Sequence, residues 1–239
     1  MMISGMMMSE EKTNELVIHS ASELTLNFPN ANQHISNEEA ERTRLAISNR
    51  GAYTPDGNAF ISKKALPKVL VTDKKGANKF VNNLDDADTI QNGTDTLVSV
   101  PAVMKEISKR IQWPIDTIKK EKLKDSEGCL TTLRDAPELE KIREIQESTI
   151  RNELPNLKKR KIKAEGITNC QVTDQPLEPN AHAHHIDRKA DNPALALELN
   201  NIVVVNPGPH DEIHAANAES VPELSALCKV NGWNDPTKS

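Results

Sequence analysis

The sequence predicts an α+β fold, and three observations lead to this expectation. The chain has 239 residues, which is enough for one large domain or two small ones. Aromatic residues make up only 3%, and the apolar residues are mostly Ala, Leu, Ile and Val, a composition that favours helices with modest cores. Short runs rich in β-branched residues interrupt the helical segments, so strands are expected as well.

Four regions follow one another along the chain. Residues 1–35 are polar and weakly periodic, so we expect them to be disordered. Residues 36–100 are expected to form a small α+β region, for which the sequence indicates no role. Residues 101–165 are expected to be a helical, basic linker, and residues 166–239 to form the C-terminal domain.

The region 36–100 begins with a helix signal. In SNEEAERTRLAISN, Ser36 and Glu39 have the spacing of a capping box, and good helix formers follow. Pro55 and Gly57 predict a turn, and the segments KVLVTD and TLVSVP are predicted to be short strands.

From Pro101 onward the pattern is helical. PAVMKEISKRIQW and PIDTIKKEKL predict two helices around a tight turn, with Pro114 in the first turn of the second. This pair fits a helix-turn-helix, but an ordinary helical hairpin is favoured because nothing specifies a recognition helix. A longer helix is expected at 137–153, broken near Pro155.

The C-terminal region predicts a compact ββα unit. AHAHHID alternates and predicts a strand, and NIVVVN is rich in β-branched residues and predicts a second strand. Between them, DNPALALEL predicts a short helix or a loop. HDEIHAAN can begin a helix after the turn NPGP, and VPELSALCKV predicts a further helix that packs against the unit.

Histidines are concentrated in this region. Five of the seven lie within the 33 residues from 182 to 214. Neutral imidazole is the commonest ligand for transition metals and also the usual general base. His210 and His214 are four apart, so on a helix they share a face and can bind one ion. His184 and His185 point to opposite sides of a strand, so one of them can face that ion while the other is free.

The order of these residues resembles the HNH nuclease superfamily. HHI, followed by NIVVVNPGPHDEIH, matches its ββα-metal motif over residues 166–218, and His210 lies nine residues after Asn201. The resemblance implies that His184, His210 and His214 coordinate one divalent metal, that His185 is the general base, and that Asn201 orients the base and its strand. The all-histidine ligand set is most similar to that of the nuclease domains of bacterial DNase toxins.

Two departures from the family bear on the metal. The Cys-x-x-Cys pairs that hold a structural zinc in many members are absent, since Asn206 and Pro209 occupy the later positions and Cys170 has no near partner, so no structural zinc is expected. Many members also have Asp where this chain has His184. A three-histidine site prefers zinc, nickel or manganese over magnesium, and the identity of the ion stays open.

The resemblance implies metal-dependent hydrolysis of phosphodiester bonds in DNA, with a phage-related or defence role by analogy alone. RNA is an alternative substrate, and a non-catalytic DNA-binding regulator with a degenerate HNH module is a second alternative. Residues 166–239 carry a net charge of −6 (4 Lys and Arg, 10 Asp and Glu), so phosphate repulsion must be offset elsewhere. The candidate for contacting nucleic acid is a basic run, although such a run is usually only a solvent-exposed helix face. Its residues are Lys158, Lys159, Arg160, Lys161 and Lys163.

The sequence also bears on the cellular compartment. No run of about 18 apolar residues exists, and the first residues lack the pattern of a secretory signal. Cys129, Cys170 and Cys228 are odd in number and widely spaced, which favours reduced thiols. We therefore expect a cytoplasmic protein with no membrane association, and the sequence indicates no particular protein partner.

Overall fold

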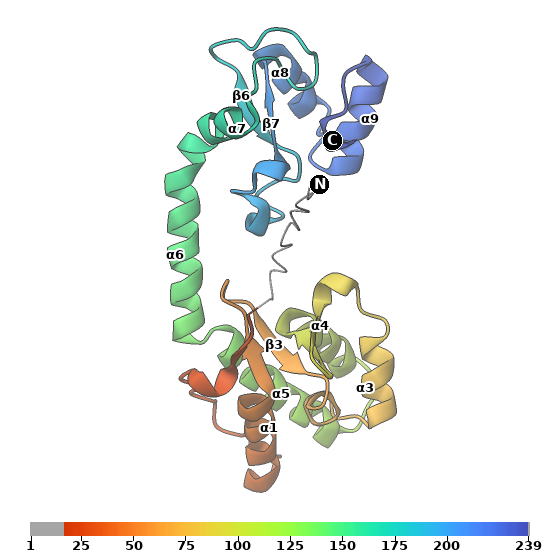
Figure 1. The fold of residues 1–239 in the computed structure, drawn as a ribbon. Coiled ribbons are helices and arrows are strands. Elements are labelled where there is room, and N and C mark those ends of the chain that lie inside the picture. The colour runs from red at the N-terminus through yellow and green to blue at the C-terminus, as the bar shows by residue number, and fades with distance from the viewer. Residues whose placement is uncertain (1–16, 239) are drawn as a thin grey trace, which may run out of the picture. The chain divides into compact units, whose positions relative to one another are not determined.

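The computed structural model describes residues 17–238, of which Figure 1 shows the ribbon. The chain divides into two compact units, Met1–Glu144 and Ile145–Ser239. It is 54% helical and 13% strand, which confirms the expected α+β class. The expected helical linker does not form one piece, because residues 101–144 belong to the first unit and pack in its core.

The first unit is built on a five-stranded antiparallel sheet. Its strand order is β1-β2-β3-β5-β4. The strands are β1 (His19–Ser20), β2 (Gly51–Tyr53), β3 (Ala59–Ser62), β4 (Thr89–Asn92) and β5 (Asp95–Ser99). The predicted strand TLVSVP is confirmed as β5 up to Ser99, whereas its last two residues begin a helix. The predicted turn around Gly57 joins β2 to β3, with Gly57 at a φ of 78°.

The first unit also contains helices. They are α1 (Asn37–Arg50), α2 (Leu66–Val69), α3 (Lys74–Val81), α4 (Val100–Ile111), α5 (Thr117–Arg134) and α6 (Pro137–Glu153), which begins in the first unit and ends in the second. Of these, α1 and α4 contact the sheet strands directly. Ser36 caps α1 by accepting a hydrogen bond from the Glu39 amide at 3.3 Å, as the sequence predicts. The second helix of the predicted hairpin begins later than expected, after the cap Asp116, so Pro114 lies outside it. Because α4 and α5 pack along each other in the core, this pair is an ordinary helical hairpin.

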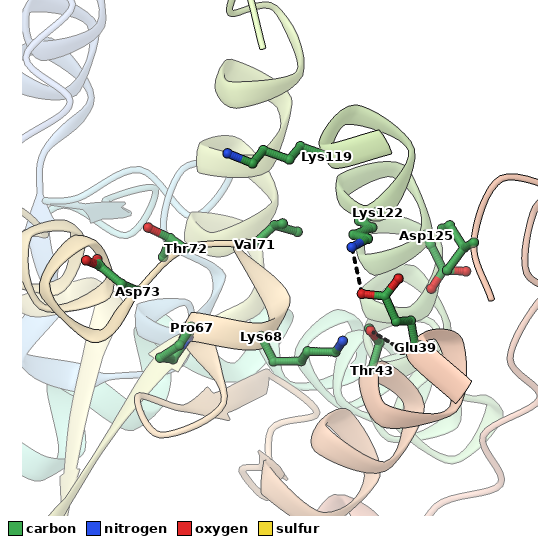
Figure 2. Close-up of a pocket in the computed structure, with 11 residues that line it drawn as sticks. Glu39, Thr43, Pro67, Lys68, Val71, Thr72, Asp73, Lys119, Lys122 and Asp125 are labelled. Atoms are coloured by element: carbon green, nitrogen blue, oxygen red, sulfur yellow. Dashed lines mark hydrogen bonds and ion pairs between the residues drawn. The ribbon is translucent and has the colours of Figure 1, made fainter. Parts of the chain in front are cut away.

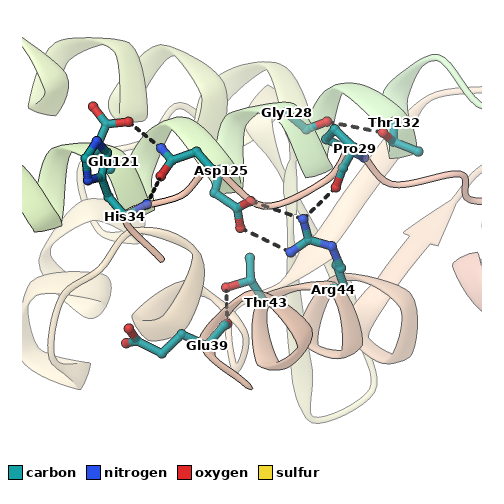
Figure 3. A network of polar contacts seen from close by, with 10 residues as sticks. Pro29, His34, Glu39, Thr43, Arg44, Glu121, Asp125, Gly128 and Thr132 are labelled. Atoms are coloured by element: carbon teal, nitrogen blue, oxygen red, sulfur yellow. Dashed lines mark hydrogen bonds and ion pairs between the residues drawn. The ribbon is translucent and has the colours of Figure 1, made fainter. Parts of the chain in front are cut away.

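The expectation of disorder over residues 1–35 is wrong for residues 17–35, and residues 1–16 lie outside the described part of the chain. Leu24, Leu26 and Phe28 alternate along an extended segment and pack against the core of the first unit. Figure 3 shows how this segment is held: the Arg44 guanidinium donates to the carbonyl oxygen of Pro29 at 2.6 Å and to both carboxylate oxygens of Asp125.

The predicted strand KVLVTD is also wrong. Its first residues end helix α2, and the others form a turn that leads into α3. Leu66, Val69 and Leu70 are at most 1% exposed and have helical spacing, so burying them on one side requires a helical turn. Val71 then adopts a left-handed backbone with a φ of 48°, and Asp73 caps α3 by accepting from the Gly76 amide at 2.7 Å.

The second unit contains a two-stranded antiparallel sheet between helices. Its regular elements after α6 are α7 (Leu157–Glu165), β6 (His182–His185), β7 (Ile202–Val205), α8 (Pro207–Ala215) and α9 (Val221–Asn231). Val203 and Val205 of β7 pack with Ile213 of α8 and Leu224 of α9 in one apolar cluster. Both predicted strands and the later helices are therefore confirmed, although α8 begins at Pro207 rather than His210.

Short 3-10 helices complete the described structure. They are η1 (Ala21–Glu23), η2 (Asp86–Asp88), η3 (Leu154–Asn156), η4 (Pro193–Leu195), η5 (Leu199–Asn201) and η6 (Pro236–Lys238). Within residues 17–238, no helix has both the length and the apolar character needed to cross a membrane.

Candidate metal centre

Three histidines from two elements of the second unit come together. His184 lies on β6, and His210 and His214 lie on α8. Each offers one ring nitrogen, and these nitrogens all lie within 4.8 Å of one another. These are the three residues that the sequence resemblance assigns as metal ligands.

Local structure explains the convergence. The β6–β7 register pairs His184 with Val203, and cross-strand partners point to the same face of a sheet. Val203 packs with Ile213, which lies on α8 between the two helical histidines in sequence, so apolar burial brings α8 onto the face that carries His184. Pro207 occupies the first turn of α8, where its missing amide proton costs no hydrogen bond, and this fixes where the helix begins.

His184 is the buried member of the group, with 6% of its surface exposed. Its Nε2 atom has no hydrogen-bond partner among the described residues. Burial is the main reason that the pKa of His184 falls to about 4, and the nearby rings of His214 and His210 lower it further. A backbone hydrogen bond with Ala218 acts in the opposite direction, which identifies a carbonyl that accepts from the ring and leaves Nε2 as a lone-pair donor.

The two helical histidines form the more exposed side. Their Nε2 atoms are 3.2 Å apart, and the rings meet edge to face with centroids 4.5 Å apart. Burial and the neighbouring His182 and His214 rings lower the pKa of His210, which keeps its ring neutral at pH 7. His182 stacks on His210 with centroids 4.4 Å apart, and the alternation of β6 puts it on the same strand face as His184.

His185 lies outside this group of ligand atoms. The alternation of β6 turns its side chain to the other face of the strand. Its Nε2 lies 2.9 Å from the carbonyl oxygen of Ala196. Because a carbonyl oxygen only accepts, Nε2 carries the proton in the neutral ring, and Nδ1 is left free to accept one.

Asn201 is buried and is hydrogen-bonded entirely to backbone. Its Oδ1 accepts from the Asp187 amide at 2.8 Å, and its Nδ2 donates to the carbonyl oxygens of Asp187 and Leu195 at 2.9 and 3.2 Å. The Asn201 carbonyl also accepts from the Ile186 amide at 2.9 Å. The side chain therefore ties together the loop that follows His185, rather than contacting the His185 ring through any of these bonds.

The basic run on α7 is divided by its environment. Lys161 is only 5% exposed, and its Nζ donates to Glu165 and to the Leu199 carbonyl oxygen, so this lysine is unavailable to a ligand. Lys158 donates to the Ala181 carbonyl oxygen at 2.9 Å, and Arg160 pairs with Glu153 at 3.4 Å. Lys159 and Lys163 are exposed. Only part of the run can therefore face a polyanion.

A polar cluster surrounds Asn206 and Cys170. The Asn206 amide donates to Cys170 Sγ at 3.4 Å, while the Asn206 side chain bonds the backbone of Pro176 and Glu178. Burial raises the pKa of Cys170, but hydrogen bonds from Thr173 and from the Asn206 backbone outweigh it and lower the pKa overall. Hydrogen bonds among these residues hold this loop.

Comparison of the chain with protein-family models, curated proteins and solved structures returns no match. The chemical capacity of the site therefore follows from its own residues. Three imidazoles that converge from a strand and a helix, with one buried nitrogen that lacks a partner, could hold a divalent metal ion.

Proposed function

We propose that the second unit is a metal-dependent HNH-type endonuclease that hydrolyses phosphodiester bonds in DNA. The observation that carries the proposal is buried His184, whose Nε2 has no partner among the described residues and which offers a ring nitrogen within 4.8 Å of those of His210 and His214. A buried polar atom without a partner is costly, and a metal ion would satisfy it.

The donor set fits a borderline transition metal. A zinc-type ion lies about 2.1 Å from each imidazole nitrogen, so its ligand nitrogens lie at most about 4.2 Å apart. His210 and His214 already meet this limit at 3.2 Å, and the remaining separations need to shrink by less than about 1 Å. Three neutral ligands favour zinc, nickel or manganese. When bound, such an ion supplies positive charge that stabilises the phosphate as negative charge develops.

His185 is proposed as the general base. Its Nε2–H donates to Ala196, which fixes the ring and leaves Nδ1 as the acceptor for a proton from water. As the O–H bond breaks, the water oxygen forms a new bond to phosphorus, and the P–O bond to the leaving nucleotide breaks. Asn201 contributes as a positioning residue, because its three side-chain hydrogen bonds hold the loop that contains Ala196.

DNA is the proposed substrate, and the charge pattern of the second unit limits how it is held. Residues 166–239 carry a net charge of −6, so the exposed Lys159 and Lys163 of α7 are the residues proposed to contact phosphate. The buried Lys161 is not part of this surface.

Plasmid cleavage with added zinc, nickel, manganese or magnesium tests the proposal. His185→Ala is expected to lose about 10²-fold or more of the cleavage rate while still binding metal, since it removes a base but no ligand. His34→Ala, which changes an exposed histidine of the first unit, is the matched control and should cut normally. Undiminished cutting by His185→Ala would show that the base is assigned wrongly.

The same assay separates the alternatives. Equal amounts of plasmid, single-stranded DNA and RNA are incubated with the loaded protein. Cleavage of RNA alone would show that the substrate is RNA rather than DNA. DNA binding without cleavage in the presence of any of the four metals would favour a non-catalytic regulator.

A further inference from the structure

We propose that the first unit carries a separate docking surface for duplex DNA, formed by helix α3 and the β4–β5 hairpin. The surface begins with a local concentration of charge. Residues 63–82 contain six lysines and one acidic residue, a net charge of +5 in a chain whose net charge is −5. A polyanion is the partner that such a segment attracts.

The segment contains a single helical turn and a longer helix joined by a tight turn, an order that is similar to a helix-turn-helix. Helix α2 (Leu66–Val69) and helix α3 (Lys74–Val81) contact each other across the short turn Leu70–Asp73. Such a turn usually contains a glycine, because one of its residues must adopt a left-handed backbone. Here Val71 adopts it, with a φ of 48°. The pair α4 and α5, which the sequence favours as an ordinary helical hairpin, packs within the core and is not available for such a role.

The exposed side of α3 is polar and basic. Lys74, Lys75, Asn78 and Lys79 are exposed, whereas Ala77 is buried against the core. Among the residues that the structure describes, no carboxylate forms an ion pair with any of these three lysines. An α-helix with its side chains is about 10–12 Å in diameter, so it fits a major groove about 12 Å wide. Asn78 lies mid-helix, and an exposed Asn can bond the edge of adenine there.

The β4–β5 hairpin lies beside this helix. A cavity of about 500 Å³ separates the two and is lined by both, and by the residues that follow β3. Its lining residues include Lys63, Lys64, Lys74, Asn78, Thr94 and Thr96. The one carboxylate in the lining, Asp95, is already paired with Lys64 at 3.4 Å and accepts from Ser62 at 2.7 Å. A phosphate backbone between helix and hairpin would therefore meet ammonium and hydroxyl donors.

A second cavity lies beside the turn. Figure 2 shows Val71, Thr72 and Asp73 along this cavity, of about 580 Å³, with Lys119 and Lys122 of α5 across from them. There Lys122 pairs with Glu39 at 2.6 Å, and Asp125 pairs with Arg44 at 3.1 Å. The proposal places DNA on α3 because three lysines lie on one exposed helix there and form no ion pair among the described residues. Asp85 and Asp88 share a further cavity with Lys79, whereas Lys74 shares its cavity only with Asp95, which is already paired with Lys64.

The test measures binding of the full chain to a labelled 30-base-pair duplex in EDTA, at several salt concentrations. The variant is Lys74→Ala/Lys75→Ala/Lys79→Ala. Its matched control, Lys120→Ala/Lys141→Ala/Lys229→Ala, removes the same charge elsewhere. The α3 variant is expected to bind about tenfold more weakly or worse, and to lower the slope of log affinity against log salt by about 2 to 3. The control is expected to change affinity less than about twofold.

Equal binding by the two triple variants would overturn the proposal. Duplex RNA of the same sequence is the second comparison, because its major groove is too narrow to admit a helix. RNA bound as tightly as DNA would overturn the placement of α3 in the groove. The inference does not rest on nuclease activity, since EDTA removes the metal. Loss of plasmid cutting would not affect it, and loss of α3-dependent binding would not affect the metal site.

Discussion

Protonation of His184 is expected to link pH to the stability of the second unit. Burial lowers the pKa of His184 to about 4 in the folded chain, from an ordinary value of 6.5. Between these values the unfolded chain holds a proton that the folded chain lacks, so the free energy of unfolding falls as the pH falls. This loss amounts to about 2 kcal/mol at pH 5, relative to pH 8. His210, whose pKa is also lowered by burial, contributes in the same direction.

Urea unfolding in EDTA at pH 8 and pH 5 measures this effect. The chain has two tryptophans, Trp113 in the first unit and Trp233 in the second, where it packs against the apolar core. In a Trp113→Phe background, fluorescence therefore reports on the second unit alone. Asp235 lies near Trp233 in the chain, and hydrogen bonds from Lys238, Ser225 and Thr237 lower its pKa. Its contribution to the free energy of unfolding is therefore lost only below its ordinary pKa of 3.8, and it does not affect the comparison between pH 8 and pH 5.

The control is His184→Gln, which removes the titrating ring. This variant should lose most of the stability difference between pH 8 and pH 5. A native second unit that is equally stable at both pH values would refute the reasoning, as would a His184→Gln variant that retains the whole difference.

Three further predictions concern polar contacts within each of the two units. Asn201→Ala leaves several buried backbone groups unpaired and should destabilise the second unit by about 1–3 kcal/mol, measured by Trp233 fluorescence, while Asn200→Ala, at an exposed neighbour, should not. Lys161→Met should lower the free energy of unfolding of the second unit by a similar amount, about 1–3 kcal/mol, and leave DNA affinity unchanged. Weaker DNA binding by this variant would show that Lys161 contacts DNA. Arg44→Ala leaves Asp125, whose side chain is 4% exposed, without its ion-pair partner. The free energy of unfolding of the first unit, measured by Trp113 fluorescence, should fall by about 3–5 kcal/mol. Arg42→Ala, which removes an exposed ion pair, should lower it by less than about 1 kcal/mol. Equal effects of Arg44→Ala and Arg42→Ala would contradict the role given to the Asp125 pair.

Most of the second unit could be predicted from sequence because its signals are local. Alternation in AHAHHID, the β-branched run NIVVVN and the four-residue spacing of His210 and His214 each specify an element and a face. The three histidine side chains come together once α8 packs against β6 and β7. Burial of Ile213 of α8 against Val203 of β7 produces this packing. The contact of His184 with the backbone of Ala218 depends on the chain path after α8, and no sequence signal gives it.

The first unit was harder, for physical reasons. KVLVTD contains β-branched residues that favour a strand, but Leu66, Val69 and Leu70 are buried on one side only in a helical turn, and tertiary packing prevails over propensity. The segment ELTLNF was expected to be disordered, although its alternating Leu24, Leu26 and Phe28 are a usable signal of an extended segment that packs on a core.

A cobalt(II) titration tests the central claim most directly, because the visible absorption of the ion reports the number and type of its ligands. The native chain is expected to bind one ion with nitrogen ligands, and His182→Ala and His185→Ala are expected to keep that ion. His184→Ala should lose it, because the buried nitrogen is the one ligand that β6 provides. A His184→Ala chain that binds cobalt as tightly as the native chain, with the same spectrum, would contradict the assignment of this site.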